Sequence, residues 1–217
     1  DFMPVGTPDG RYVVFVSERG GSSHIWRMDA DGGNPTQLTH GIGDIFPSLS
    51  PDGRWVVYNS SATGKAALWK VSIDGGEAAQ LAEWKTAPTM RPQISPNGNF
   101  LAFQYLDETE RKLKVAVLPF DGKELKPIGD PKLEMPLPEF GLFRWMPDSR
   151  SLTYIVTQNG ASNIWSKPID GGEARRLTNF TSDQIFRFAW SRDGKSLACE
   201  RGMVINDAVL LHSVKAE

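Results

Sequence analysis

The 217-residue sequence predicts an all-β fold, a β-propeller of four-stranded antiparallel blades, on three observations. First, the nine-residue stretch SPDGRWVVY at residues 50–58 recurs in four variant copies. Second, the turn residues Asp9, Asp52, Asn97, Asp148 and Asp193 stand 43, 45, 51 and 45 residues apart, the period of a four-stranded blade. Third, each unit repeats one order of strand and turn signals, with no amphipathic helix longer than a turn.

Each unit begins with a short strand that leads into the repeated turn. These strands are predicted at residues 2–6, 45–49, 90–94, 142–145 and 186–190. Pro4, Pro47 and Pro92 occupy one column of them. Proline cannot donate to a strand ladder, so this column fits the innermost strand of a blade, beside the central channel.

The Pro-Asp-Gly turn leads into the second strand. Proline at its second position and glycine at its fourth fit a type I turn, so the aspartate needs no functional explanation. The second strands are predicted at residues 12–16, 55–58, 100–105, 152–156 and 196–200. The polar stretch at residues 107–114 is then a long loop.

The third strand carries a tryptophan 17 residues after the turn aspartate in three units, at Trp26, Trp69 and Trp165. Their fixed place in the blade favours packing between blades over a sugar-stacking platform. An Asp-Gly turn follows, a strong hairpin signal. The fourth strand is predicted at residues 35–39, 79–81, 125–128 and 175–178, and unit five stops after a third strand at 208–211, which makes nineteen strands.

The repeats predict one propeller domain over residues 1–217, with units at about 1–40, 41–84, 85–129, 130–180 and 181–217. Because the chain starts inside a strand without an initiating methionine, we expect it to be part of a longer protein. Four prolines, Pro127, Pro131, Pro136 and Pro138, predict an extended arm across the face that carries the long connections.

Composition and charge limit the classes of function. The net charge of −2 and the lack of a Lys/Arg run argue against nucleic-acid or anionic-membrane binding. No stretch approaches the ~18 apolar residues of a membrane span. The single cysteine, Cys199, excludes an internal disulfide and a cysteine zinc site, and its column predicts a buried position.

Catalytic and metal signals are weak. The sequence has no Gly-x-Ser-x-Gly, His-Glu-x-x-His or Gly-x-x-x-x-Gly-Lys motif. His24, His40 and His212 fall in different units, and Asp29 with Asp31 lacks the further ligands of a calcium loop. We therefore expect no catalytic residue, no metal and no cofactor in this segment.

The blade topology indicates where a binding site would lie. Both tight turns fall on one face of the disc, so the long connections share the opposite face, where binding residues usually lie. The beginnings of the innermost strands rim the channel there, and their mixture of charged and aromatic residues suits a ligand or peptide site. The alternative interpretation is that these charged and aromatic residues are ordinary solvent-exposed loop residues. The candidates are Asp44, Phe46, Arg91, Phe140, Arg144, Asp183 and Arg187.

The repeated order Ser-Pro-Asp-Gly-Arg, Ile-Trp, Asp-Gly-Gly and Gln-Leu-Thr resembles the TolB-like, WD-repeat-like β-propeller repeats of bacteria. Unit three departs with Asn97 and Ala116, unit four with Ser149, and unit five with Arg192. Residues 193–211 also resemble the C-terminal propeller of bacterial serine/threonine kinase or winged-helix signalling proteins.

The resemblance implies a non-enzymatic sensor or scaffold that binds a protein or peptide, or alternatively a small ligand, and it favours an extracytoplasmic or periplasmic place. The runner-up is the non-catalytic gating propeller of a serine peptidase. A propeller lyase or hydrolase would need acids, histidines or a metal clustered at the channel mouth, where only Asp44 and Asp183 are obvious.

Overall fold

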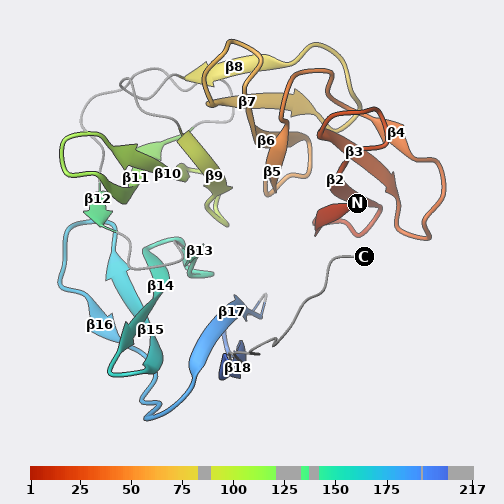
Figure 1. Ribbon diagram of the computed structural model, residues 1–217. Helices are drawn as coiled ribbons and strands as arrows, with labels where there is room; N and C mark the ends of the chain where they lie inside the picture. Colours follow the sequence, from red (N-terminus) through yellow and green to blue (C-terminus); the bar gives the residue numbers. More distant parts are fainter. Residues whose placement is uncertain (83–88, 121–132, 137–141, 192, 205–217) are drawn as a thin grey trace, which may run out of the picture.

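The computed structural model describes residues 1–82, 89–120, 133–136, 142–191 and 193–204. These residues form five antiparallel sheets around a central opening, and no helix (Figure 1). The prediction of an all-β propeller is confirmed. None of the described residues forms a helix long and apolar enough to cross a membrane.

Each of the first four sheets has four strands that follow one another in chain order from the opening outwards. The first blade holds β1 (Phe2–Gly6), β2 (Tyr12–Ser17), β3 (His24–Asp29) and β4 (Thr36–Gln37). The second holds β5 (Ile45–Leu49), β6 (Trp55–Ser60), β7 (Ala67–Ser72) and β8 (Ala79–Ala82). The third holds β9 (Thr89–Ile94), β10 (Phe100–Asp107), β11 (Lys112–Pro119) and β12 (Leu133–Pro136).

The fourth blade holds β13 (Phe143–Trp145), β14 (Ser151–Gln158), β15 (Ala161–Pro168) and β16 (Arg175–Arg176). The fifth sheet pairs β17 (Gln184–Trp190) with β18 (Leu197–Gly202). Strands β1, β5, β9, β13 and β17 lie nearest the opening (Figure 1). The third strand predicted for unit five, at residues 208–211, lies outside the described residues.

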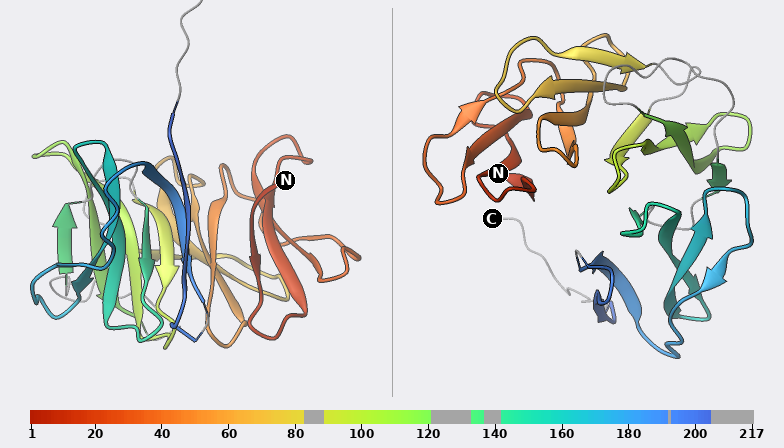
Figure 2. Two further views of the ribbon diagram at one scale, coloured as in Figure 1. Left: turned by 90° about the horizontal axis from the view of Figure 1, so that it is seen from below. Right: turned by 180° about the vertical axis from the view of Figure 1, so that it is seen from behind.

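Both kinds of tight turn lie on one face of the disc. The N–H of Ile73, before the Asp-Gly turn of the second blade, donates to the carbonyl of Arg54, after its Pro-Asp-Gly turn, at 2.9 Å. Equivalent bonds join these turns in the first and fourth blades, and in the third blade the N–H of Phe120 donates to the carbonyl of Asn99 at 2.8 Å. We call this side the turn face and the opposite side the loop face; Figure 2 shows the strands running between them.

The Pro-Asp-Gly turn is a structural unit. The hydroxyl of Ser50 donates to the carboxylate of Asp52 and accepts the N–H of Trp55 at 2.9 Å. The first of these bonds holds the pKa of Asp52 below its usual value. Gly53 has a φ of 71°, a left-handed conformation that glycine adopts without the strain of a Cβ. The aspartate and glycine therefore serve the turn, as predicted.

The hydrophobic core lies between the blades. Four clusters of buried side chains each combine residues of two adjacent blades, for example Val14 and Ile25 with Tyr58 and Val71. Trp69 and Trp165 pack, half-buried, against two of these clusters, which confirms the packing role predicted for them. The Arg19 guanidinium stacks on Trp26, 4.8 Å from the ring centroid.

The third blade differs from the sequence prediction. Its outer strand is β12, which includes Pro136, a residue that the sequence places in an arm across the loop face. The expected strand at 125–128 and the prolines Pro127, Pro131 and Pro138 lie outside the described residues. The predicted loop at 107–114 is also wrong, because β10 and β11 pair as far as Asp107 and Lys112.

Cys199 provides a smaller correction, because it is half-buried rather than buried. It packs at the edge of the cluster between the fourth and fifth blades, and its partial burial raises the pKa of the thiol.

Candidate functional site

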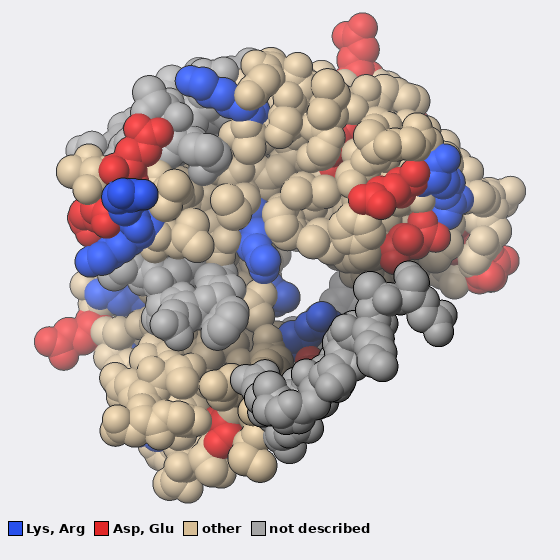
Figure 3. Space-filling view, viewed as in Figure 1, with Lys and Arg blue, Asp and Glu red and all other residues tan. Residues whose placement is uncertain are grey.

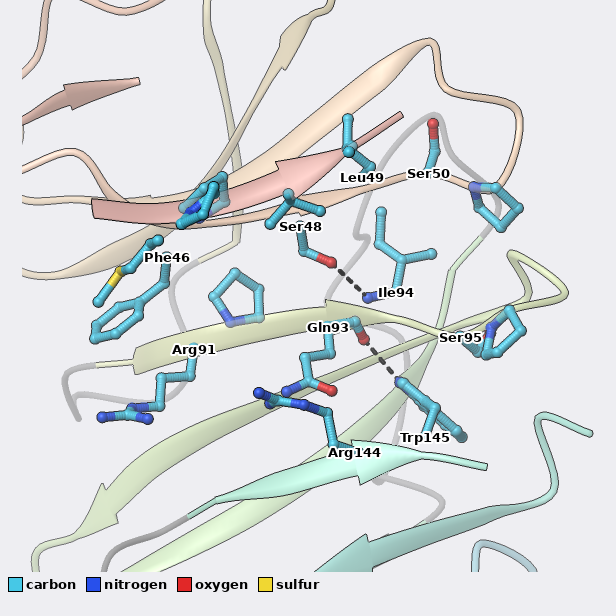
Figure 4. Close-up of a pocket in the computed structure, with 18 of the residues that line it drawn as sticks. Phe46, Ser48, Leu49, Ser50, Arg91, Gln93, Ile94, Ser95, Arg144 and Trp145 are labelled. Carbon is cyan, nitrogen blue, oxygen red and sulfur yellow. Dashed lines mark hydrogen bonds between the residues drawn. The ribbon is translucent and has the colours of Figure 1, made fainter. Parts of the chain in front are cut away.

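The central opening contains a hollow of about 1060 Å³. Its walls are the innermost strands β1, β5, β9 and β13, joined by Arg187 of β17 (Figures 3 and 4). We call this hollow the channel. Its volume matches the upper end of the range for ligand sites.

Bulges in three innermost strands turn side chains into the channel. Met3, Phe46 and Arg91 have positive φ angles of 54°, 58° and 53°, and each precedes a proline. The pairing register shifts at each of these places. A left-handed conformation costs a residue other than glycine about 1–2 kcal/mol. This strained conformation occurs at the equivalent residue of three blades, which indicates that the bulge serves to direct these side chains into the channel.

One side of the channel is basic. The described residues that line it include Arg91, Arg144 and Arg187 but no aspartate or glutamate, and basic side chains gather round the opening in Figure 3. The guanidinium of Arg91 lies 4.9 Å from the centroid of the Phe46 ring. Arg187 has a carboxylate neighbour, Glu200, at 3.8 Å, but both side chains are exposed to water, so this pair is weak.

Arg91 and Arg144 lie close enough for their charges to interact. Partial burial lowers the pKa of Arg91; burial and then the positive charge of Arg91 lower the pKa of Arg144. Arg144 is nevertheless an exposed residue that lines the channel. Both groups remain cationic at neutral pH, because the ordinary pKa of a guanidinium lies far above neutral. No carboxylate of the described residues lies within ion-pair distance of either group.

Hydrogen bonds between blades fix this part of the wall. The side-chain amide of Gln93 donates to the carbonyl of Phe143 at 2.8 Å. The indole N–H of Trp145 donates to the carbonyl of Gln93 at 2.9 Å (Figure 4). The N–H of Ile94 donates to Ser48 at 3.1 Å. The strands that carry Arg91 and Arg144 are therefore joined before any ligand binds.

The structure brings together four of the predicted site residues, Phe46, Arg91, Arg144 and Arg187. Phe140 lies outside the described residues. Asp183 lines a smaller hollow on the loop side of the fifth blade, with its carboxylate 3.6 Å from Arg201. Sequence reasoning missed Met3, although it shares its column with Phe46 and Arg91, and missed Gln93, for which the sequence offered no signal.

Asp44 does not reach the channel, which corrects the prediction. Its side chain is 0% exposed, between the first two blades. It accepts the N–H of Gly41 at 3.0 Å and lies 3.3 Å from Nδ1 of His24. The second carboxylate oxygen, Oδ1, is buried without a hydrogen-bond partner. The side chain of Asp44 points into the junction between the first two blades, because the bulge at Phe46 separates Asp44 from the part of β5 that lines the channel.

Ser22, His24 and Asp44 form a chain of contacts, with Ser22 Oγ 2.8 Å from His24 Nε2. This order is that of a hydrolytic triad, but neither hollow described above includes any of the three residues. The contacts instead support the junction of the first two blades. No group of three metal-ligating side chains occurs among the described residues.

Comparisons with known proteins agree with this architecture. TolB from Acinetobacter baumannii superposes with a TM-score of 0.64 at 19% identity, over 79% of this chain and 44% of that one. A chain of the nidogen/laminin complex gives 0.59 at 14% identity, over 88% and 68%. At these identities the likeness shows the fold.

Two curated relatives are peptidases by name. Tricorn protease homolog 1 of Streptomyces coelicolor is 28% identical over 103 residues, which is 48% of this chain and 9% of that protein. The uncharacterized peptidase YuxL of Bacillus subtilis is 38% identical over 55 residues, 25% of this chain and 8% of that protein. This chain thus spans less than a tenth of either relative.

The family model of the TolB β-propeller domain matches residues 1–136, more than half of the sequence. This match covers the first three blades, whose turns and bulged innermost strands are described above. The chain belongs to the TolB β-propeller domain family.

Proposed function

We propose that this propeller is a non-enzymatic recognition module that binds a protein or peptide at its loop face, with the channel as the central contact. The observation that carries the proposal is the convergence of Phe46, Arg91 and Arg144 on one hollow, two of them on neighbouring blades joined by hydrogen bonds. Aromatic and arginine side chains are enriched among the residues that dominate binding energy at interfaces.

The comparisons support the proposal at the level of architecture. A structural relative lies in a complex of two proteins, nidogen and laminin. The matched part of each curated relative is a small fraction of a much longer protein. We accordingly propose that this propeller is the recognition part of a longer protein.

A peptide library tests the proposal, because selection from random sequences requires no choice of partner. The protein is immobilised, random peptides displayed on phage are selected against it, and the Kd of each selected peptide is measured by fluorescence anisotropy. The variants are Phe46→Ala and Arg187→Ala at the loop-face side of the channel. Arg54→Ala is the matched control, because its side chain is 81% exposed on the turn face.

We expect selected peptides to lose about tenfold or more in affinity with Phe46→Ala, the scale of an interface hot spot. A smaller loss is expected with the exposed Arg187→Ala, and none with Arg54→Ala. Circular dichroism checks that each variant is folded. Peptides that bind Phe46→Ala and Arg187→Ala as tightly as the wild type, or lose affinity only with Arg54→Ala, would contradict the proposal.

A further inference from the structure

We infer that the segment bound in the channel is an acidic peptide, with carboxylates at Arg91 and Arg144 and an apolar side chain beside them against Met3 and Phe46. This inference rests on the proposed function and adds the chemistry of the partner. It follows from the charge of the channel, from the donors that its arginines leave free, and from the apolar half of its wall.

The charge of the channel is opposite to that of the chain. The sequence has 26 acidic and 24 Lys/Arg residues, a net charge of −2. The described lining nevertheless holds three arginines and no acidic residue. A concave site lined by charges of one sign concentrates its field and attracts the opposite charge. A partner that enters the channel therefore meets a positive potential.

The arginines have donors to spare for carboxylates. A guanidinium has five N–H donors, and its fork matches the two oxygens of a carboxylate. Arg144 uses Nη1 for the carbonyl of Phe143 at 3.0 Å. Arg91 lies over the Phe46 ring, 4.9 Å from its centroid, a contact that uses no hydrogen-bond acceptor. Among the described residues no acceptor takes up the remaining N–H groups, and the repulsion between the two cations would be relieved by an anion between them.

The part of the wall next to Arg91 is apolar. It is formed by the first and second blades, where Met3 is 37% exposed and Phe46 is half-buried, with Pro4 and Pro47 beside them. No charged residue of these two blades is among the described lining residues. A small inorganic anion would match only the basic half. A peptide that combines acidic and apolar side chains matches both, and this favours a peptide.

The test uses two synthetic probes and the full chain. One fluorescent peptide has four glutamates around a central phenylalanine, and its counterpart has four glutamines in their place. Anisotropy gives the Kd of each for the wild type, for Arg91→Ala/Arg144→Ala and for the turn-face control Arg54→Ala. Inorganic tripolyphosphate is titrated as a competitor, and thermal unfolding of each variant is recorded.

We expect the acidic peptide to bind the wild type at least about tenfold more tightly than the glutamine peptide. The double variant should lose that preference and Arg54→Ala should keep it. Raising the salt concentration should weaken the acidic peptide more than its counterpart, because charge attraction is screened. If the double variant unfolds at a lower temperature than the wild type, Arg91→Met, which retains an apolar stem, replaces it. Arg91→Met should likewise lose the preference for the acidic peptide.

Three results would overturn the inference. In the first, the two peptides bind equally well. In the second, the preference survives loss of both arginines, which would place the acidic contact elsewhere. In the third, tripolyphosphate displaces the peptide and binds more tightly, which would make the channel a site for small anions. If the peptide library instead yields neutral peptides that depend on Phe46, the proposed function stands and the acidic partner is wrong.

Discussion

Replacing Gly41 by alanine should destabilise the junction of the first two blades. A Cβ on Gly41 would lie 2.6 Å from Oδ1 of Asp44 and 2.7 Å from Oγ of Ser60. Asp44 is fully buried and Ser60 is 1% exposed, so neither side chain can move towards water. The φ angle of Gly41 is not positive, so the effect measures packing and not backbone strain.

The expected magnitude follows from two contributions. Overpacking in a well-packed interior costs about 1–3 kcal/mol. Displacing Asp44 also weakens its bond from the Gly41 N–H, at 3.0 Å, and a hydrogen bond to a charged group contributes about 1.5–3 kcal/mol. We expect a loss of about 3 kcal/mol in the free energy of unfolding, or about 6–12 °C in Tm for a chain of this size.

Urea unfolding followed by tryptophan fluorescence measures this loss. Gly6→Ala is the matched control, because its added Cβ has nothing within 4 Å and should change the stability by less than about 0.5 kcal/mol. In an Asp44→Ala background the cost of Gly41→Ala should shrink, because the contact at 2.6 Å is gone. A cost for Gly41→Ala equal to that of Gly6→Ala would refute the reasoning.

Three further predictions concern the turns and the wall of the channel. Ser50→Ala should lower the free energy of unfolding by about 1 kcal/mol at neutral pH. Because the pKa of Asp52 in the folded state lies below 3.8, the stability difference between wild type and variant should shrink as the pH falls below that value. A difference that stays constant with pH would contradict this. Ser149 has a φ of 59°, and its hydroxyl accepts the N–H of Asn97 at 3.0 Å. Both Ser149→Ala and Ser149→Gly lose this hydrogen bond, but only glycine relieves the strain of the left-handed backbone. We expect the glycine variant to be about 1 kcal/mol more stable than the alanine variant in urea unfolding, and equal stabilities would contradict this. Trp145→Phe removes the donor to the carbonyl of Gln93 and should cost about 1 kcal/mol in urea unfolding; an unchanged free energy of unfolding would contradict this.

The repeated elements could be predicted because their causes are local. Ser50, Asp52 and Gly53 interact within one turn, and the period of such turns determines the order of the strands. The structure also places Phe46 and Arg91 at the channel, in keeping with the column that they share at a fixed distance before the first turn of each unit. The third blade was predicted less well, because its outer strand begins at Leu133, well after the Asp121-Gly122 signal from which the sequence predicts a strand at 125–128.

The error at Asp44 has a different cause. Side chains alternate between the faces of a strand, so a shift of one residue moves a side chain to the other face. The bulge at Phe46 makes such a shift between Asp44 and the part of β5 that lines the channel. Its left-handed backbone, at a phenylalanine before a proline, has no marker in the sequence. The burial of Asp44 and its contact with His24 could therefore be found only from the structure.

The placement of the core between blades also determines the order in which the blades unfold. Each of the four clusters joins one blade to the next, and among the described residues none joins the fifth blade to the first. The core contacts of the described residues thus form a row of nearest neighbours that runs from the first blade to the fifth. The amides of β17 and β18 should exchange with solvent deuterium earlier than those of β10, which is bordered by packed blades on both sides. The last blade to open would be the third, whose strand β9 carries Arg91.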